Sequence, residues 1–218
     1  MTQPPAPVIQ IDIISDVMCP WCIVGFKQLE LALGQTGVGA RVRWHPFELN
    51  PDMGPEGENL SEHIQRKYGA TPEKSAQNRQ QLQDIGAALG IAFNFTEDSR
   101  IVNSFKAHVL LDHAATKGIQ HPLKLALFKA HFTDGKDVSD ESVLLDIAQS
   151  VGLDRADCEA ALHSVAHAKA VRAQEQVWQQ HGISGVPSMI FDEKYLITGA
   201  QGPQNYARML QKVIADAA

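Results

Sequence analysis

The stretch Ser15–Gly25, SDVMCPWCIVG, places two cysteines where a predicted strand gives way to a predicted helix. Residues 8–14 before it alternate isoleucine with other side chains, as expected of a strand in a core. Pro20 suits the first position of a helix, which makes Cys19 its N-cap. The free N–H groups of the first turn and the positive end of the helix then favour thiolate over thiol at Cys19. Cys22, three residues on, can close a disulfide with Cys19 or resolve a mixed one.

A C-x-x-C pair can also be half of a zinc site. A structural zinc ion needs four ligands, usually from a second cysteine or histidine pair at short spacing. The only other cysteine is Cys158, and no histidine lies within twenty residues of Cys22. His163 and His167 share a helix face, but a metal site there would need a third ligand. The context strand, C-x-x-C, helix therefore favours dithiol–disulfide exchange, and Cys158 is predicted to be a small apolar helix residue.

The composition is that of an ordinary globular protein. The 218 residues are 44% hydrophobic and 20% charged, enough for one domain or for one domain with a large insertion. A net charge of −6 and a pI near 5.8 argue against nucleic-acid and membrane-surface partners. Residues 1–7 show no export signal, and no run is long enough to span a membrane. We expect residues 1–7 to be a disordered lead-in and the protein to be cytoplasmic, where disulfides are mostly transient and catalytic.

The N-terminal part of the chain reads strand, helix, strand. Alternation predicts strands over 8–14 and 41–45, and a helix runs between them from 20 to about 33, with Gly34 and Gly37 as its stop. The length of this connection favours a parallel pairing of the two strands, with the helix on one face of the sheet.

From about residue 60 the strand pattern stops for more than a hundred residues. Capping residues, prolines and terminal glycines mark a series of expected helices. They cover residues 61–69, 72–89, 103–117, 122–132, 141–151 and 155–181, the last with a break expected near Ser164.

The strand pattern returns near the C-terminus. Residues 186–191 and 195–199 predict an antiparallel hairpin, which a helix over 203–215 follows. The fold class predicted is α/β, a thioredoxin-like core (β-α-β … β-β-α) with a large all-helical insertion. Residues 8–57 and 183–218 would form the core, and residues 58–182 the inserted helical domain.

Several motifs together resemble the DsbA-like thiol–disulfide oxidoreductases. They are the sequence Cys19-Pro20-Trp21-Cys22, the helical insertion and the segment Gly185-Val186-Pro187. Further stretches are similar to the FrnE-type branch of that family, the dithiol–disulfide isomerases: Ser15–Val17, Pro46–Pro51, Asn103–His108 and Gly199–Gln201. The similarity covers nearly the whole chain.

The resemblance implies roles for individual positions. Cys19 would be the attacking thiolate, Cys22 the resolving thiol, and Pro187 a cis-proline that faces the dithiol. The backbone of Val186 would then pair with an extended substrate strand. The resemblance also suggests that Asn103 and His108 line the substrate cleft, with an ordinary, partly buried helix residue as the alternative for His108.

Two residues beside the cysteines are further candidates. Trp21, next to Pro20, is predicted to be a surface aromatic that shields the disulfide and contacts substrate, and packing on a neighbour is the alternative. Asp16 is predicted to cap the loop in an Asx-type turn, with an acid–base role towards Cys22 as the alternative.

A related family offers a different activity. The kappa-type glutathione transferases and hydroxychromene-carboxylate isomerases share the interrupted core, but they carry serine where Cys19 and usually Cys22 stand. Serine only hydrogen-bonds a glutathione thiolate, whereas a cysteine pair can exchange with it. We therefore expect a thiol–disulfide oxidoreductase or protein disulfide isomerase that needs no metal or organic cofactor. Its partners would be protein or peptide thiols and disulfides, with glutathione or a dithiol reductant resetting it; a glutathione-dependent transferase or isomerase is the alternative.

Overall fold

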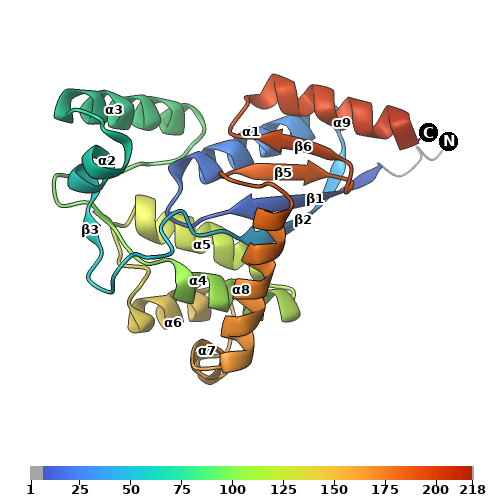
Figure 1. Cartoon of the computed structure of the whole chain (residues 1–218). Coiled ribbons are helices and arrows are strands. Elements are labelled where there is room, and N and C mark those ends of the chain that lie inside the picture. Colours follow the sequence, from blue (N-terminus) through green and yellow to red (C-terminus); the bar gives the residue numbers. More distant parts are fainter. Residues whose placement is uncertain (1–6, 218) are drawn as a thin grey trace.

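The computed structural model describes residues 7–217, and its main sheet has the strand order β2-β1-β5-β6 (Figure 1). Strand β1 (Val8–Ser15) runs parallel to β2 (Gly39–Pro46) and antiparallel to β5 (Ser188–Phe191). Strand β6 (Tyr195–Thr198) completes the predicted hairpin with β5. The parallel pair, the hairpin and the thioredoxin-like core are therefore confirmed.

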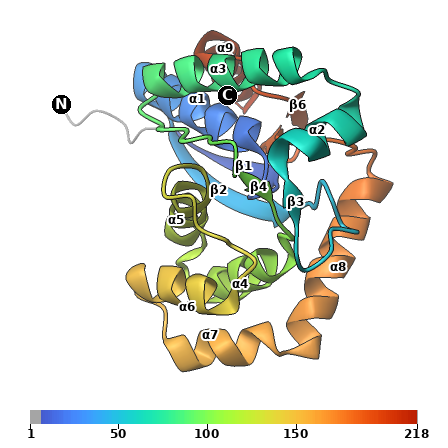
Figure 2. The same ribbon diagram turned by 90° about the vertical axis from the view of Figure 1, so that its left-hand side faces the viewer.

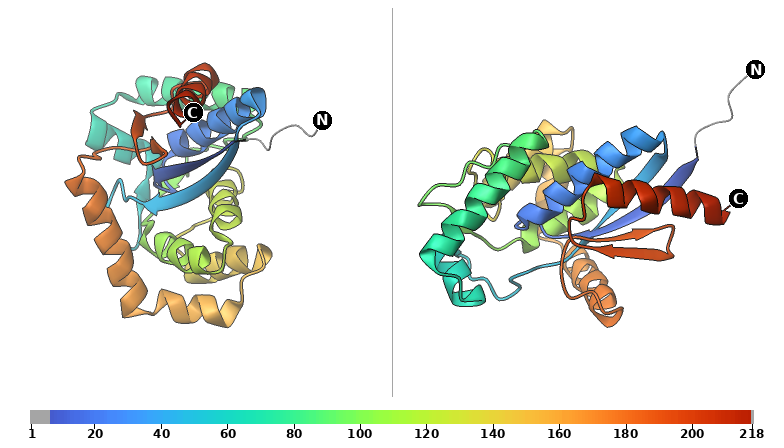
Figure 3. Two further views of the ribbon diagram at one scale, coloured as in Figure 1. Left: turned by 90° about the vertical axis from the view of Figure 1, so that its right-hand side faces the viewer. Right: turned by 90° about the horizontal axis from the view of Figure 1, so that it is seen from above.

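Two helices of the core lie side by side on one face of the sheet (Figure 3). Helix α1 (Pro20–Thr36) joins β1 to β2, and α9 (Pro203–Ala217) follows β6. The predicted end of α1 near residue 33 was too early, because the helix runs through Gly34. It ends at Gly37, whose φ of 67° lies in the left-handed region that suits a glycine C-cap.

The segment between β2 and β5 is largely helical, as predicted. Its helices are α2 (Leu60–Tyr68), α3 (Pro72–Ala88), α4 (Phe105–Thr116), α5 (Gln120–Phe132), α6 (Glu141–Ser150), α7 (Arg155–Leu162) and α8 (Val165–Gln180). The expected break near Ser164 is confirmed, since its hydroxyl accepts the His167 N–H at the start of α8. The segment also holds two minimal strands, β3 (Glu58–Asn59) and β4 (Arg100–Ile101), which are too short to show alternation.

The inserted helices form two groups (Figures 1 and 2). Helices α2 and α3 lie together and α3 contacts α1, whereas α4 to α8 form a bundle in which α5 and α8 contact the edge strand β2. The boundaries of the insert at residues 58 and 182 remain a prediction.

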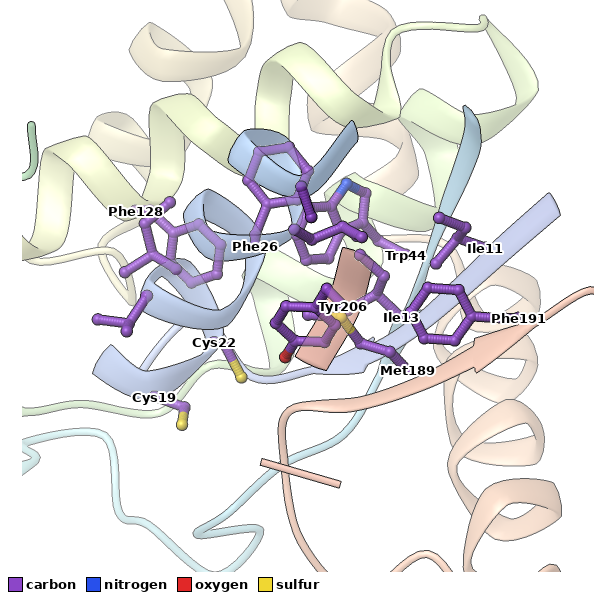
Figure 4. Close-up of a cluster of buried hydrophobic side chains, with 14 of the residues drawn as sticks. Ile11, Ile13, Cys19, Cys22, Phe26, Trp44, Phe128, Met189, Phe191 and Tyr206 are labelled. Atoms are coloured by element: carbon purple, nitrogen blue, oxygen red, sulfur yellow. The ribbon is translucent and has the colours of Figure 1, made fainter. Parts of the chain in front are cut away.

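Two large hydrophobic clusters meet at the beginning of α1. One lies between α1, the sheet and α9, and Figure 4 shows members such as Ile13, Phe26 and Met189. The other fills the bundle of α4 to α7 and includes Cys158, which is fully buried as predicted. Val17 belongs to this second cluster, so the loop that leads to the dithiol is anchored in the insert.

The N-terminal lead-in expected over residues 1–7 lies outside the described residues except for Pro7. The carbonyl oxygen of Pro7 accepts a hydrogen bond from the N–H of Gly39 at 2.9 Å. In the part of the chain that the structure describes, no helix combines the length and the apolar character needed to cross a membrane.

Candidate active site

The two cysteines occupy the predicted positions at the start of α1. Cys19 is the N-cap, with the extended backbone angles φ −94° and ψ 110°, and Pro20 is the first helical residue. Among the described residues no side chain caps this helix by a hydrogen bond. The side chain of Cys19, as the N-cap, lies at the positive end of the helix dipole. The N–H of Cys22 donates to the carbonyl oxygen of Cys19 at 3.0 Å, which closes the first turn.

The two sulfurs differ in their access to solvent. Figure 4 shows them next to each other at the N-terminal end of α1, at the margin of the hydrophobic cluster. The Cys22 side chain is fully buried, whereas Cys19 keeps 4% of its surface exposed. Trp21 between them is 38% exposed, as predicted for a surface aromatic. Cys19 is therefore the less buried of the two cysteines.

The segment before β5 lies against the dithiol. The Cys19 thiol donates to the carbonyl oxygen of Val186 at a distance of 3.6 Å. The Val186–Pro187 peptide bond is cis, as the resemblance implied. A Cβ atom added to Gly25 would lie 3.2 Å from Cγ of Pro187, so the absence of a side chain there lets α1 approach this segment.

The two thiols ionise as a pair. The shared hydrogen bond with Cys22, together with burial, raises the pKa of Cys19 well above its usual value. Burial also opposes ionisation of Cys22, but the hydrogen bond from Cys19, the Ser15 hydroxyl and the charge of Lys124 together lower the pKa of Cys22. Lys124 and the hydrogen bonds thus favour a negative charge at Cys22, whereas the N-terminus of α1 favours one at Cys19. That Cys19 is the attacking thiolate stays a prediction.

Asp16 holds the loop before the dithiol, and the predicted Asx-type turn is confirmed. Its Oδ1 atom accepts the N–H of Met18 at 3.0 Å, and its Oδ2 atom accepts the N–H of Leu49 at 2.7 Å. The carboxylate thereby ties the cysteine loop to the loop that follows β2. Burial would raise the pKa of Asp16, but His108, with Nε2 3.6 Å from Oδ1, and the two backbone donors outweigh burial and lower it.

Asn103 and His108 lie at the start of α4, close to this loop. The Asn103 amide donates to the carbonyl oxygen of Met53 and accepts the N–H of Phe105, each at 2.9 Å. The His108 side chain is 2% exposed. Both residues thus link segments around the dithiol, and their part in substrate binding remains a prediction.

Lys124 is a member of the site that the sequence analysis missed. It lies on α5 of the insert, fully buried, and its charge acts on Cys22. The signal in the sequence is a lysine among apolar residues, with Leu123, Leu127 and Phe128 as helical neighbours. That pattern gives no indication that the charge of the lysine acts on the dithiol, because this depends on how the insert packs against the core.

The two histidines considered as metal ligands have separate carboxylate partners. His163 Nε2 lies 2.8 Å from Glu141 Oε1, and His167 Nδ1 lies 2.9 Å from Asp112 Oδ2. Over residues 7–217 the structure contains no group of three or more histidine, cysteine or acidic side chains arranged to hold a metal ion.

Comparisons with known proteins match nearly the whole chain. The family model "DSBA-like thioredoxin domain" matches residues 10–211. A crystal structure of a probable DsbA oxidoreductase from Streptomyces coelicolor is 30% identical and superposes with a TM-score of 0.88, covering 95% of this chain and 90% of that one.

Two more distant structures share the fold. The cytosolic disulfide reductase DsbM from Pseudomonas aeruginosa, solved with GSH, is 16% identical with a TM-score of 0.64, covering 94% of this chain and 99% of that one. A 2-hydroxychromene-2-carboxylate isomerase is 17% identical with a TM-score of 0.69, and covers 95% of each chain. The fold alone therefore does not separate the two activities, and the chemistry of the site must do so.

Proposed function

The chain belongs to the family of DSBA-like thioredoxin domains, and from this premise we propose that it is a thiol–disulfide oxidoreductase that acts through a Cys19–Cys22 dithiol. The observation that carries the proposal is the position of Cys19. It lies at a helix N-terminus, is less buried than Cys22 three residues on, and contacts the Val186 carbonyl. This arrangement supplies an attacking sulfur, a resolving sulfur and a backbone surface beside them.

The proposed reaction has two exchange steps. In the reducing direction, Cys19 as thiolate attacks a substrate disulfide, which forms a mixed disulfide and releases one substrate sulfur as a thiol. The Cys22 thiolate then attacks the Cys19 sulfur, which forms the Cys19–Cys22 disulfide and releases the second substrate thiol. The oxidising direction is the reverse, and isomerisation combines the two. A protein disulfide isomerase of the FrnE type is the finer form of this proposal.

The substrate would be an extended protein or peptide segment at the dithiol. The backbone of Val186 and the ring of Pro187 would contact the segment next to the mixed disulfide. Trp21, with Pro20, would cover it from the other side, because Trp21 presents an exposed aromatic surface. Asn103 would border this groove, and His108, being buried, would contribute through Asp16.

We further propose that the protein works in the cytoplasm without a metal or organic cofactor, and that glutathione or a dithiol reductant resets it. The fold neighbour from Pseudomonas aeruginosa is a cytosolic disulfide reductase solved with GSH, which supports both the compartment and the redox partner.

A redox titration tests the proposal. The protein and its Cys19→Ser and Cys22→Ser variants would be equilibrated in glutathione buffers, and the free thiols counted after alkylation. We expect a reversible two-electron transition in the wild type that is lost in both variants.

The alternative, a glutathione-dependent transferase or isomerase, gives a different pattern. It predicts that no Cys19–Cys22 disulfide forms at any ratio of reduced to oxidised glutathione. It also predicts saturable glutathione binding that persists in Cys22→Ser. That result would refute the oxidoreductase proposal.

A further inference from the structure

Lys124 is a fully buried charged side chain that has no part in the exchange steps proposed for the dithiol. Its side chain is fully buried, and within residues 7–217 its Nζ atom has no hydrogen-bond acceptor. The ammonium lies over two aromatic rings instead, 5.4 Å from the ring centre of Trp44 and 4.9 Å from that of Phe128. Both rings belong to the buried hydrophobic cluster that includes Cys22. An amino group in such a position is costly to charge unless a negative group lies nearby.

A small cavity adjoins the ammonium. It has a volume of about 10 Å³, near the size of one water molecule, and Lys124, His108, His45 and Asp112 are among its lining residues. His108 Nε2 lacks a hydrogen-bond partner among the described residues, as does Lys124 Nζ. Within residues 7–217 the ammonium therefore has polar surroundings but no anion that is hydrogen-bonded to it.

Two carboxylates near Lys124, those of Asp112 and Asp16, have other partners. Asp112 is engaged by His167 and by the Gln174 amide, at 2.9 and 2.8 Å. Asp16 is engaged by two backbone N–H groups and faces His108. The charges of Cys22, Asp16 and Cys19 all act on Lys124. Of these three groups, the two cysteines are the ones whose charge changes when the dithiol is oxidised.

We propose that Lys124 is the buried cation that stabilises the Cys22 thiolate, and that it thereby controls how fast Cys22 releases substrate from Cys19. The charge relation holds in both directions. Lys124 lowers the pKa of Cys22. Burial lowers the pKa of Lys124 to about 8, and the charges of Cys22, Asp16 and Cys19 oppose this fall. At neutral pH the lysine is therefore still largely protonated.

The step that Lys124 assists rests on the proposed dithiol function. Cys22 loses a proton, and its thiolate attacks the Cys19 sulfur of the mixed disulfide. The Cys19–Cys22 bond forms as the bond from Cys19 to the substrate sulfur breaks, so Cys22 is oxidised, the substrate sulfur is reduced, and Cys19 stays at the disulfide level. The leaving thiolate takes up a proton, which balances the one lost by Cys22. Lys124 acts through Cys22 and keeps its own proton, so it is a positioning residue.

A titration of the wild-type protein tests the charge relation without any risk of misfolding. The protein would be labelled with ¹³C-lysine, and the Cε signal of Lys124 followed against pH by NMR in the dithiol and disulfide forms. Formation of the disulfide removes the negative charge from Cys22, so we expect the midpoint of Lys124 to fall by roughly one pH unit. Equal midpoints in the two forms would overturn the proposal.

The Lys124→Met variant tests the effect on rate and identifies the NMR signal. The mixed disulfide of Cys19 with glutathione would be prepared, and glutathione release followed from pH 5 to 10. The release rate should rise with pH as Cys22 ionises. In Lys124→Met we expect this rise to occur about one pH unit higher than in the wild type, and release at pH 7 to be about tenfold slower. A purely structural role would lower the rate equally at every pH.

The matched control is Lys129→Met, on the same helix, where the lysine is exposed and paired with Asp134. It should leave the profile unchanged. A profile of Lys124→Met that coincides with the wild type would refute the role of Lys124. If the wild type itself releases no glutathione and forms no disulfide, the proposed function fails first. If Lys124→Met does not fold, Lys124→Arg identifies the NMR signal instead, and the wild-type titration then decides.

Discussion

The sulfur of Cys19 lies 3.6 Å from the carbonyl oxygen of Val186, although 167 positions separate the two residues along the chain. The central pairing of the sheet produces this contact, because Ile14 at the end of β1 is paired with Ser188 at the start of β5. In the proposed reaction, a substrate sulfur bonded to Cys19 would lie near the backbone of Val186. The strands of the core thus fix the position of Val186 next to Cys19.

The difference in exposure between the two sulfurs predicts which variant traps substrate. With Cys22→Ser, oxidised glutathione should form a stable mixed disulfide on Cys19, because the resolving sulfur is missing. With Cys19→Ser, adduct formation should fall by about a hundredfold or more, since Cys22 is fully buried. Mass spectrometry of the intact protein checks this, with Cys158→Ser as the control that leaves the adduct unchanged. An adduct on Cys22 in the Cys19→Ser variant would reverse the assigned roles.

The exposed indole of Trp21 predicts an effect on substrate binding without an effect on stability. Trp21→Ala should change the free energy of unfolding by no more than about 0.5 kcal/mol, since the ring is 38% exposed at the second position of α1. It should raise KM for a peptide disulfide roughly three- to tenfold, because the peptide loses an aromatic contact. Urea unfolding and steady-state kinetics measure the two quantities. A large loss of stability with an unchanged KM would support the alternative that Trp21 packs on a neighbour.

Two glycines in α1 predict opposite effects of the same substitution. At Gly25 a Cβ atom would lie 3.2 Å from Pro187 Cγ and 3.3 Å from both Met189 Cε and Tyr206 Oη, so Gly25→Ala should destabilise the fold by about 1–3 kcal/mol. At Gly34 no described atom beyond the helix lies within 4 Å, and Gly34→Ala should stabilise it by about 0.5–1 kcal/mol. Chemical denaturation of the pair gives the comparison. Equal effects at both positions would show that close packing against Pro187 is not what keeps residue 25 a glycine.

The parts of the site that the sequence predicted are those that depend on local spacing. Cys19, Pro20 and Cys22 are close in the chain, and an N-cap followed by proline fixes their geometry whatever the rest of the protein does. The hairpin was equally readable, since the short segment Asp192-Glu193-Lys194 separates two strand patterns. In the structure these two strands pair antiparallel, and Asp192 and Glu193 have positive φ. The position of Val186 beside Cys19 was implied only by the resemblance to a family.

The parts that the sequence did not predict depend on packing between distant segments. Lys124 lies on α5, and nothing in its neighbours along the helix shows that α5 contacts β2 near the dithiol. The second hydrogen-bond donor to Asp16, the N–H of Leu49, comes from a loop 33 residues further along the chain. Helix α1 also passed Gly34, because a single glycine inside a helix costs only about 1 kcal/mol and the rest of the helix outweighs it.

Glu48 predicts a change of stability with pH. Burial, and then the charge of Glu175, raise the pKa of Glu48 from 4.5 to about 7, although Arg172 contacts both carboxylates. Between those two pH values the folded protein holds a proton that the unfolded chain has lost. The free energy of unfolding should therefore fall as the pH rises from about 5 to 8.

The Glu48→Gln variant tests this, because glutamine has no proton to lose. The stability of Glu48→Gln relative to the wild type should increase by about 1–2 kcal/mol between pH 5 and pH 8, less than the full shift implies because solvent screens charges near the surface. Urea unfolding at both pH values gives the difference. Glu56→Gln, at an exposed position, is the control, and its stability relative to the wild type should be the same at pH 5 and pH 8. If the stability of Glu48→Gln relative to the wild type is also the same at both pH values, the proton on Glu48 is not linked to folding. The contact with Arg172 then compensates the charge of Glu48 fully.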